Sequence, residues 1–327
     1  MKRIIVFGAS GDIGIYLIDY LHKYFKDEYE IIAVGTRCTN YFDRFGIKYI
    51  RVDITSVDAF HSLPEDNIYA VIHLSGVMSA HMKKYNPQSY IDVNITGTLN
   101  ILEYCRMNNI NRILYAQSWS DLAGYVGESN LVIRPYMPRK LKLVGDHAVY
   151  SISKSAAVDL IEHYHQEYGI KSFIFRLPNI YMYHPEEYYY VDGNSTIIAY
   201  RHMIRRATEG LPIELWGNPS KSKDIIYIKD LCQLFCKAIA IKAVSSGTYN
   251  AGTGVRTTML AQIEGIIKVF SQKNKKSVII YCPEKPDCPD YVMDIENAKN
   301  ELGYFPQYDY IAYLEDYKKE MQSDRFK

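Results

Sequence analysis

Residues 2–14 read KRIIVFGASGDIG, and this stretch decides the fold. Residues 2–7 are a short, mostly apolar run ended by glycine, which is typical of a strand buried on both faces of a parallel sheet. Residues 15–24 then place apolar side chains at helical spacing. A strand, a glycine-rich turn and a helix are the context of a dinucleotide site, because glycines let the backbone approach a pyrophosphate and the helix N-terminus supplies amide donors. The spacing of the glycines is GxxGxxG.

Further strands follow at intervals that leave room for helices between them. The apolar runs that predict them are residues 30–34, 48–52, 69–74 and 112–116. This alternation predicts a Rossmann-type, doubly wound α/β fold with a parallel sheet. We expect a dinucleotide-binding domain made of residues 1–178 and 225–254, and a smaller C-terminal α/β substrate domain made of residues 179–224 and 255–327.

The smaller domain has a less regular pattern. Residues 181–194 are rich in tyrosine and contain Pro185 and Gly193, which predicts a loop that closes over the substrate. Residues 195–210 have helical spacing, and residues 223–230 predict a strand that rejoins the core. Pro283, Pro286 and Pro289 indicate an extended loop.

The composition excludes several classes of protein. The chain has 327 residues, 48% of them hydrophobic, and a net charge of +1, so no global field favours nucleic acid or an anionic membrane as partner. No signal peptide and no apolar run of roughly 18–20 residues is present, which favours a cytoplasmic protein. The six cysteines form no CxxC pair, and we interpret Cys232 and Cys236 as apolar packing residues of one helix, so no metal site is predicted.

The end of the second strand bears on the choice of cofactor. An acidic residue there holds the ribose hydroxyls of NAD, whereas a small residue with a nearby arginine leaves room for the 2′-phosphate of NADP. The sequence has Gly35-Thr36-Arg37, which favours NADP over NAD, although Arg37 also fits a solvated loop. Asp53, after the third strand, is placed either to meet the adenine amino group or to cap the next helix.

A tyrosine and a lysine stand one helical turn apart in Tyr150-Ser151-Ile152-Ser153-Lys154. Residues i and i+4 share a helix face, and a nearby ammonium favours the ionised form of a phenol. We therefore expect the amine to lower the pKa of Tyr150 and make it a proton donor and acceptor for an alcohol or ketone. Ser118 follows the strand at residues 112–116, where a hydroxyl points toward ligands bound at the carboxyl end of the sheet.

With these pieces in order, the chain resembles the extended short-chain dehydrogenase/reductase family, in its group of nucleotide-sugar epimerases and dehydratases. The resemblance covers nearly the whole chain. The stretches that carry it, in family order, are GASGDIG, VIHLSG, NITGTLNILE, RILYAQS, YSISK, RLPNIY, KDIIYIKD, TYNAGTG and DIENAKNELGYFP.

The resemblance implies a role for each matching residue. Tyr150 would be the catalytic acid and base, Lys154 its cationic partner and a ribose ligand, and Ser118 the hydroxyl that steadies the reacting oxygen, with Ser120 as the alternative. Asn94 would support the helix that carries the lysine. The implied cofactor contacts are Gly8, Ser10, Gly11, Asp12, Ile13, Gly14, Arg37, Asp53, Ile54, Leu74, Ser75, Gly76, Asn94, Tyr150, Lys154 and Pro178. The implied substrate contacts are Ser118, Asn179 and Lys223, and a homodimer formed through a helix bundle is also implied.

Departures from the family pattern bear on the reaction. Dehydratases of the family follow the catalytic hydroxyl with an Asp-Glu pair, but this chain has Trp119-Ser120, which disfavours a 4,6-dehydratase. Lys223 replaces an arginine that grips the substrate diphosphate; lysine keeps the charge but loses the bidentate fork. A later family arginine is replaced by Glu284 or Lys285.

The function predicted is that of an NAD(P)-dependent oxidoreductase that acts on a nucleotide sugar through a keto intermediate. An epimerase is favoured by overall similarity, whereas Gly35 and Arg37 favour an NADPH-dependent ketosugar reductase. A catalytically idle dinucleotide-binding sensor or scaffold is the remaining alternative.

Overall fold

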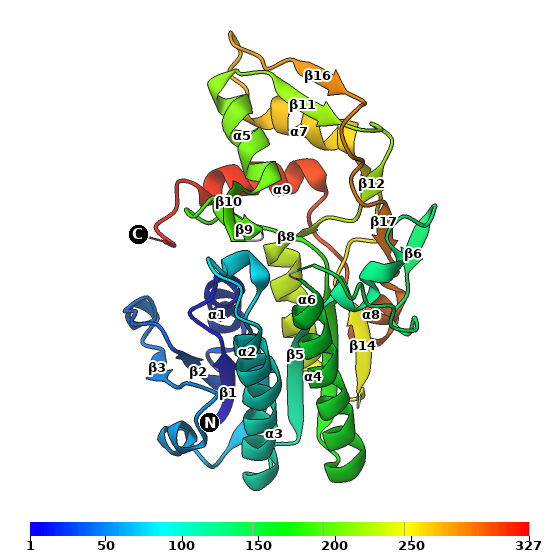
Figure 1. Cartoon of the computed structure of the whole chain (residues 1–327). Coiled ribbons are helices and arrows are strands. Elements are labelled where there is room, and N and C mark those ends of the chain that lie inside the picture. Colours follow the sequence, from blue (N-terminus) through cyan, green and yellow to red (C-terminus); the bar gives the residue numbers. More distant parts are fainter. Residues whose placement is uncertain (146, 192, 245, 327) are drawn as a thin grey trace.

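Seven parallel strands form the centre of the computed structural model, which describes residues 1–145, 147–191, 193–244 and 246–326 (Figure 1). Asp192, in the predicted loop, and Lys327 lie outside these residues. The strands are, in spatial order, β14 (Gly247–Asn250), β7 (Lys171–Leu177), β5 (Arg112–Ser118), β4 (Ile68–His73), β1 (Lys2–Phe7), β2 (Tyr29–Gly35) and β3 (Lys48–Arg51). Strand order reverses between β1 and β4, which is where ligands bind in doubly wound sheets. The Rossmann-type prediction is confirmed.

Both faces of the sheet are buried, as the apolar run of β1 requires. Ile4 and Val6 pack on one face with residues of α1 (Asp12–Phe25) and α6 (Ile228–Ala240). Ile5 and Phe7 pack on the other face with residues of α3 (Gly97–Met107) and α4 (His147–Tyr168). Successive strand residues point to opposite faces, so one short run serves both layers. Among the described residues, no helix is long and apolar enough to cross a membrane.

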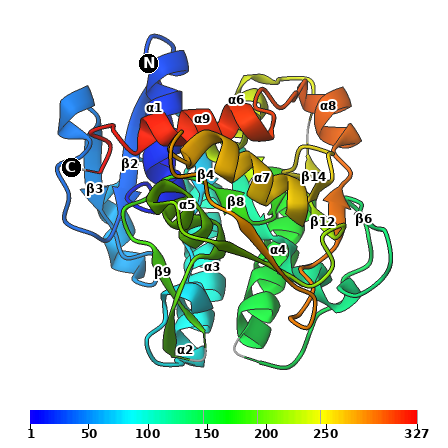
Figure 2. The same ribbon diagram turned by 90° about the horizontal axis from the view of Figure 1, so that it is seen from above.

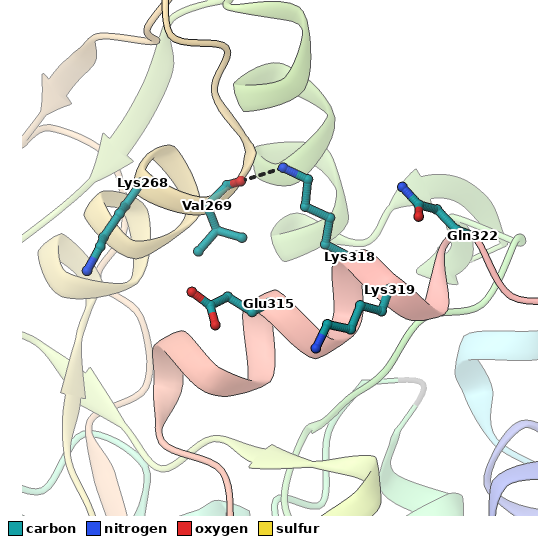
Figure 3. A pocket seen from close by; sticks show the side chains of 6 residues that line it. All are labelled: Lys268, Val269, Glu315, Lys318, Lys319 and Gln322. Carbon is teal, nitrogen blue, oxygen red and sulfur yellow. Dashed lines mark hydrogen bonds between the residues drawn. The ribbon is translucent and has the colours of Figure 1, made fainter.

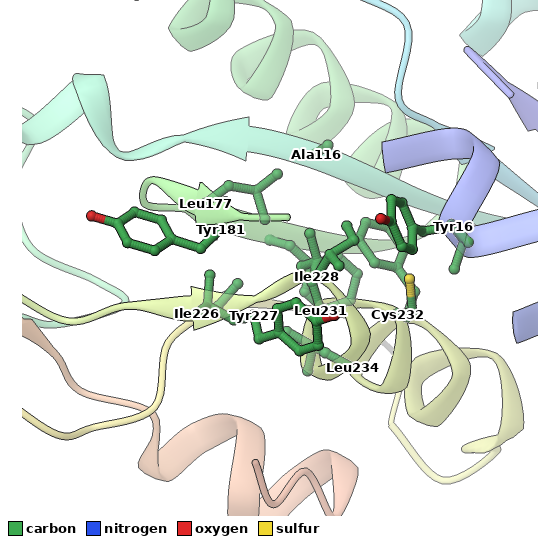
Figure 4. Packing of buried hydrophobic residues seen from close by; sticks show 14 of the residues in the cluster. Tyr16, Ala116, Leu177, Tyr181, Ile226, Tyr227, Ile228, Leu231, Cys232 and Leu234 are labelled. Carbon is green, nitrogen blue, oxygen red and sulfur yellow. The ribbon is translucent and has the colours of Figure 1, made fainter. Parts of the chain in front are cut away.

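Helix α6 shows why its cysteines are structural. Cys232 lies beside Leu231 in the packed layer around Tyr16 of α1 (Figure 4). Cys232 and Cys236 are both buried and free, and burial raises the pKa of both thiols. Their interpretation as apolar packing residues is confirmed.

Most of the remaining elements lie beyond the carboxyl ends of the central strands, whereas α8 (Glu296–Leu302) lies beside β14 and α6 (Figures 1 and 2). Short strands dominate here. One sheet has the order β15-β12-β17-β6, and three pairs are β13-β8, β11-β16 and β10-β9. The bounds of these elements are β6 (Leu131–Ile133), β8 (Ile180–Tyr181), β9 (Tyr188–Val191), β10 (Asn194–Ile197), β11 (Ile213–Trp216), β12 (Ser222–Lys223), β13 (Ile226–Tyr227), β15 (Thr257–Thr258), β16 (Ile279–Cys282), β17 (Tyr291–Met293), α5 (Ala199–Glu209), α7 (Met259–Phe270), α8 (Glu296–Leu302) and α9 (Tyr310–Glu320).

Two predictions for this region are wrong. The loop predicted for residues 181–194 contains strand β9, and the helix predicted to begin at residue 195 begins only at Ala199, because residues 194–197 form β10. The two strands make an antiparallel hairpin in which Val191 pairs with Asn194. Aromatic and β-branched residues favour strands, and they flank Gly193, whose φ of 78° suits the turn.

The strand predicted for residues 223–230 is also wrong. β12 and β13 are separate two-residue strands, and α6 already begins at Ile228. β12 pairs with β15 and β17, and β13 pairs with β8, so neither joins the seven-stranded sheet. The break between them holds Asp224, whose buried carboxylate accepts hydrogen bonds from the backbone of Thr253, Gly254 and Met293.

Candidate active site

The glycine turn between β1 and α1 is packed too closely for side chains. Gly8 has a φ of 82°, and a Cβ added there would lie 2.7 Å from the amide nitrogen of Ser75. A Cβ on Gly14 would lie 2.3 Å from the carbonyl oxygen of Gly8. Helix α1 begins at Asp12 with Gly11 at its N-cap, and no side chain among the described residues caps it, so its first amides are open to a ligand. A backbone cradle with free amides fits a pyrophosphate.

The ribose end of the candidate cofactor site lies beside Gly35. A Cβ at Gly35 would lie 2.5 Å from Oγ of Ser10, so the strand end and the glycine turn are in contact. Nη1 of Arg37 donates to the carbonyl oxygen of Ser10 at 3.1 Å. Arg51, which the sequence analysis missed, donates from Nε to the carbonyl oxygen of Thr36 at 3.2 Å. Its signal was its position as the last residue of the third strand.

Asp53 and Ile54 follow β3. Oδ1 of Asp53 accepts from the amide (3.0 Å) and the hydroxyl (2.8 Å) of Thr55, whereas the residue at the N-cap of the following 3₁₀ helix (Val57–Ser62) is Ser56. The helix-cap interpretation of Asp53 is therefore wrong, because the carboxylate closes a local turn instead. Ile54 is buried, and its side chain fills the space beside Gly97 of α3.

Asn94 links two segments of the site. It lies in a π-helical turn (Ile91–Thr96) that joins α2 (Pro87–Tyr90) to α3. Oδ1 of Asn94 accepts from the amide of Val77 at 2.8 Å, and Nδ2 donates to Oγ of Ser153 at 3.0 Å. The residue next to Ser153 is Lys154, so Asn94 ties the lysine's helix to the turn Leu74-Ser75-Gly76. A Cβ on Gly76 would lie 4.0 Å from Nζ of Lys154.

Ser118 and Tyr150 are brought together from different elements. Ser118 is the last residue of β5, and Tyr150 lies in the first turn of α4. A hydrogen bond between their side chains lowers the pKa of Tyr150, but burial has the larger effect, and the net pKa is raised. Ser120, the alternative hydroxyl, has a buried Oγ without a hydrogen-bond partner among the described residues, while its amide donates to Oγ of Ser118.

Lys154 does not play the part in tuning Tyr150 that its spacing predicted. Its Nζ donates to the carbonyl oxygen of Ala116 at 2.7 Å and lies 4.1 Å from the centre of the Tyr115 ring. Burial lowers the pKa of Lys154 to about 7. The expectation that the amine lowers the pKa of Tyr150 in the protein alone is wrong, because the same burial that positions both groups disfavours charge on each.

Lys223 lies on the substrate side. Burial is the largest single effect and lowers the pKa of Lys223, but the interactions with Tyr181 and Cys288 together raise it, and the net pKa is raised. Nζ of Lys223 lies 5.5 Å from the centre of the Tyr181 ring. Within the described part of the chain, Lys223 forms no ion pair with a carboxylate. A partly buried ammonium without a carboxylate is suited to an anionic ligand.

Two aromatic residues that were not predicted as site residues connect Lys223 to Ser118. Tyr291 of β17 is the strand partner of Lys223, and its ring stacks on Trp119 with 4.7 Å between centroids and 26° between planes. Trp119 directly follows Ser118. Pro178, which directly follows β7, is buried, and Asn179 next to it is exposed. Trp119 could have been found from its position, since it follows the strand end that carries the hydroxyl.

A separate pocket lies between α7 and α9 (Figure 3). Its lining residues are Lys268, Val269, Glu315, Lys318, Lys319 and Gln322. Lys318 is already engaged, because its Nζ donates to the carbonyl oxygen of Val269 at 2.8 Å. None of the predicted site residues lines this pocket.

The glycine cradle, the switch point and the Ser118–Tyr150 pair define a dinucleotide-binding α/β enzyme fold. More specifically, the chain belongs to the NAD dependent epimerase/dehydratase family, whose model matches residues 4–252. A UDP-glucuronate 4-epimerase of Thermodesulfobacterium geofontis is 26% identical over 318 residues, covering 94% of this chain and 92% of that protein.

Solved structures agree on the fold. The UDP-N-acetylglucosamine 4-epimerase of Bacillus cereus matches with a TM-score of 0.78 at 21% identity, covering 99% of this chain and all of that one. The UDP-glucuronic acid 4-epimerase of Bacillus cereus in complex with NAD matches with a TM-score of 0.74 at 20% identity, covering 98% of this chain and 100% of that chain.

Proposed function

We propose that the protein is an NAD(P)-dependent epimerase that inverts a hydroxyl-bearing carbon of a nucleotide sugar through a keto intermediate. The observation that carries the proposal is the hydrogen-bonded pair of Ser118 and Tyr150, held beside buried Lys154 at the sheet edge that also carries the glycine cradle. Membership of the epimerase/dehydratase family and its similarity to 4-epimerases support it.

In this mechanism Tyr150 takes the proton of the reacting hydroxyl, and Ser118 holds the same oxygen. A nicotinamide held by the glycine turn and Lys154 would supply reversible hydride acceptance, which inversion of the carbon requires. Lys154 binds ribose hydroxyls and, when protonated, stabilises the phenolate of Tyr150. A pKa of about 7 lets Lys154 hold or give up its proton at neutral pH. Tyr150 then returns its proton to the inverted alkoxide.

The substrate side of the site has a cation that suits the diphosphate of a nucleotide sugar. We propose that Lys223 binds the diphosphate of the nucleotide sugar, and that Asn179 contacts the same ligand. Trp119 and Tyr291 lie between Lys223 and Ser118, so a sugar ring held at both ends would rest against aromatic side chains. On this proposal residues 179–224 and 255–327 form the substrate-binding part. The pair Trp119-Ser120 supplies no carboxylate for removing water, which argues against a dehydratase.

The cofactor end favours a second candidate. Arg37 donates to the backbone of Ser10 in the glycine turn, and Arg51 donates to the backbone of Thr36. No acidic residue stands in Gly35-Thr36-Arg37. We propose that this end accepts NADP at least as well as NAD, which would suit an NADPH-dependent ketosugar reductase. The related crystal structure that contains NAD supports the other cofactor.

Purified protein tests these proposals. We expect epimerisation of a nucleotide sugar without added cofactor, and the absorbance band of reduced nicotinamide after the sugar is added. The rate of Tyr150→Phe should be lower by about 10²–10⁴-fold. The rate should fall by less in Ser118→Ala than in Tyr150→Phe. A rate that requires stoichiometric NADPH would identify the reductase. Dinucleotide binding without turnover on any nucleotide sugar would identify the idle sensor, and an unchanged rate in Tyr150→Phe would remove that residue from the mechanism.

We also propose a homodimer formed through α3 and α4. Exposed apolar side chains lie on both helices, among them Leu99, Met107 and Ile152. Light scattering should give twice the mass of the chain. The double variant Leu99→Lys/Ile152→Lys should give the monomer mass, and a monomeric wild type would contradict the proposal.

A further inference from the structure

The strap, defined as residues 182–187, crosses from β8 toward the start of α1. The hydroxyl of Tyr16 in α1 donates to the carbonyl oxygen of Tyr183 at 2.9 Å. On the other side, the hydroxyl of Tyr200 in α5 donates to the carbonyl oxygen of Met182 at 2.8 Å, and Arg201 donates to that of His184 at 3.2 Å. The strap is therefore held between the glycine-turn helix and α5.

His184 of the strap faces the first residue of α1. Its Nε2 lies 3.6 Å from Oδ1 of Asp12. Its Nδ1 accepts from the amide of Glu186 at 3.0 Å, which places the hydrogen of the neutral ring on Nε2, toward Asp12. The other charged groups that act on the ring are the guanidiniums of Arg201 and Arg37. His184 therefore lies beside the N-terminus of α1, at the pyrophosphate end of the candidate cofactor site.

Asp12 lies in the first turn of α1, close to the free amides of the helix. A carboxylate in the first turn of a helix interacts favourably with the free amides, which are the same groups that a pyrophosphate needs. Asp12 forms no hydrogen bond with those amides within the described residues, and its carboxylate is turned to His184 instead. His184 thus keeps a negative side chain away from the anion site.

Residues near the C-terminal end support His184 from behind. The ring of Phe326 packs edge-on against the imidazole, with 4.6 Å between centroids, and also contacts the ring of Tyr16. Arg325 forms an ion pair with Asp19 of α1. The imidazole is therefore fixed on one side by an aromatic ring and on the other by the strap backbone.

We propose that His184 and Asp12 form a clasp over the pyrophosphate position, which slows release of the bound dinucleotide. The inference rests on the proposed function, because it needs the dinucleotide site. It makes His184 a positioning residue: it acts through Asp12 and through the strap, which must move for a pyrophosphate seated on the amides of α1 to leave. Slow release matters most to an enzyme that must reuse the same nicotinamide in the second half of its reaction.

The release rate of NADH tests the clasp. Full-length protein is loaded with NADH, and the loss of its bound fluorescence is followed after mixing with excess ADP-ribose. We expect roughly fivefold faster release from His184→Ala, the size of one partly exposed charged contact. His184→Gln, which can place an amide donor where Nε2 lies, should recover part of the loss. His202→Ala is the matched control, since His202 lies on α5 beside Arg205 and should not change release.

The outcomes separate a clasp from a merely structural contact. Faster release from His184→Ala, at an unchanged melting temperature of the cofactor-free protein, supports the clasp, and Phe326→Ala should move release in the same direction. Release from His184→Ala at the wild-type rate overturns the clasp while leaving the dinucleotide site intact. A wild-type protein that binds no NADH would overturn the clasp and the proposed function together. Binding of NADH to wild type therefore distinguishes failure of the clasp alone from failure of the proposed function.

Discussion

Replacing Lys154 by methionine should stabilise the cofactor-free protein while abolishing turnover. The ammonium is almost completely buried, donates one hydrogen bond to Ala116, and has a pKa of about 7 against an ordinary value of 10.5. Burial therefore penalises the charged form. Methionine has a similar length and no charge, so it removes the penalty but leaves the carbonyl of Ala116 without its donor.

The size and sign of this effect follow from linkage. Between pH 7 and 10.5 the unfolded chain binds the lysine proton and the folded chain releases it, so wild-type stability rises with pH across this window. Each tenfold change in proton affinity is worth about 1.4 kcal/mol, so the full penalty is about 4–5 kcal/mol below pH 7 and disappears near pH 10.5. The lost bond to Ala116 costs about 1–3 kcal/mol at every pH. The variant should thus be more stable by about 1–4 kcal/mol at pH 6 and less stable than wild type near pH 10.

Urea unfolding at pH 6 to 10 measures the difference in free energy of unfolding between wild type and Lys154→Met. Subtracting the two curves removes every other titrating group that both proteins share. Lys84→Met, at an exposed position, is the control and should give a difference that does not change with pH. A Lys154→Met difference that is constant within about 0.5 kcal/mol over this range would refute the reasoning, because the burial penalty would then be absent.

Three further variants test the packing that positions the site. Gly8→Ala should weaken dinucleotide binding and lower the free energy of unfolding by more than about 2 kcal/mol, because the added Cβ meets the backbone of Ser75 at a positive φ. Gly46→Ala also has a positive φ, but its Cβ would lie in open space, so it should cost only about 1–2 kcal/mol in thermal unfolding. Asn94→Ala leaves the amide and carbonyl of Val77 without their partner and removes one of the two bonds of the Ser153 hydroxyl. It should cost about 2–4 kcal/mol in urea, with a shifted pH profile of turnover because the lysine's helix is released. Arg176→Met strands the buried carboxylate of Asp121 and should cost about 3–5 kcal/mol, and Arg176→Met/Asp121→Leu should recover part of this loss; equal losses in the single and double variants would contradict the argument.

Rules that use only neighbouring residues predicted the strands and turns with a distinctive sequence pattern. The run before Gly8 needed only buried-strand logic, and the site at the sheet edge followed because parallel strands end together. The glycine turn and five of the seven central strands required no knowledge of distant contacts, whereas β7 and β14 were not predicted and the joint role of Ser118 and Tyr150 came from the family resemblance.

Long-range packing decided where those rules failed. The pKa of Lys154 depends on how completely the surrounding layers exclude water, which no spacing reports. The hairpin at residues 188–197 was misassigned because two short strands gain stability only from pairing with each other. His184 gave no signal, because its contact is with Asp12, 172 positions earlier in the chain. Tyr291 gave none either, because it is linked to the site only through its stacking on Trp119.

Several hydrogen-bond donors of this site lack an anionic partner among the described residues, which makes them costly to the free protein but useful for binding a ligand. The first amides of α1, the ammonium of Lys154 and the ammonium of Lys223 all lack an anionic partner within the described chain. Each is costly to bury alone and is relieved by a ligand that supplies oxygen or negative charge. Binding a dinucleotide should therefore stabilise wild type by more than it stabilises Lys154→Met, because only wild type gains a ligand for its amine. The stability advantage of Lys154→Met at pH 6 should accordingly shrink when saturating NAD is added, and an advantage that grows instead would show that Lys154 opposes the cofactor.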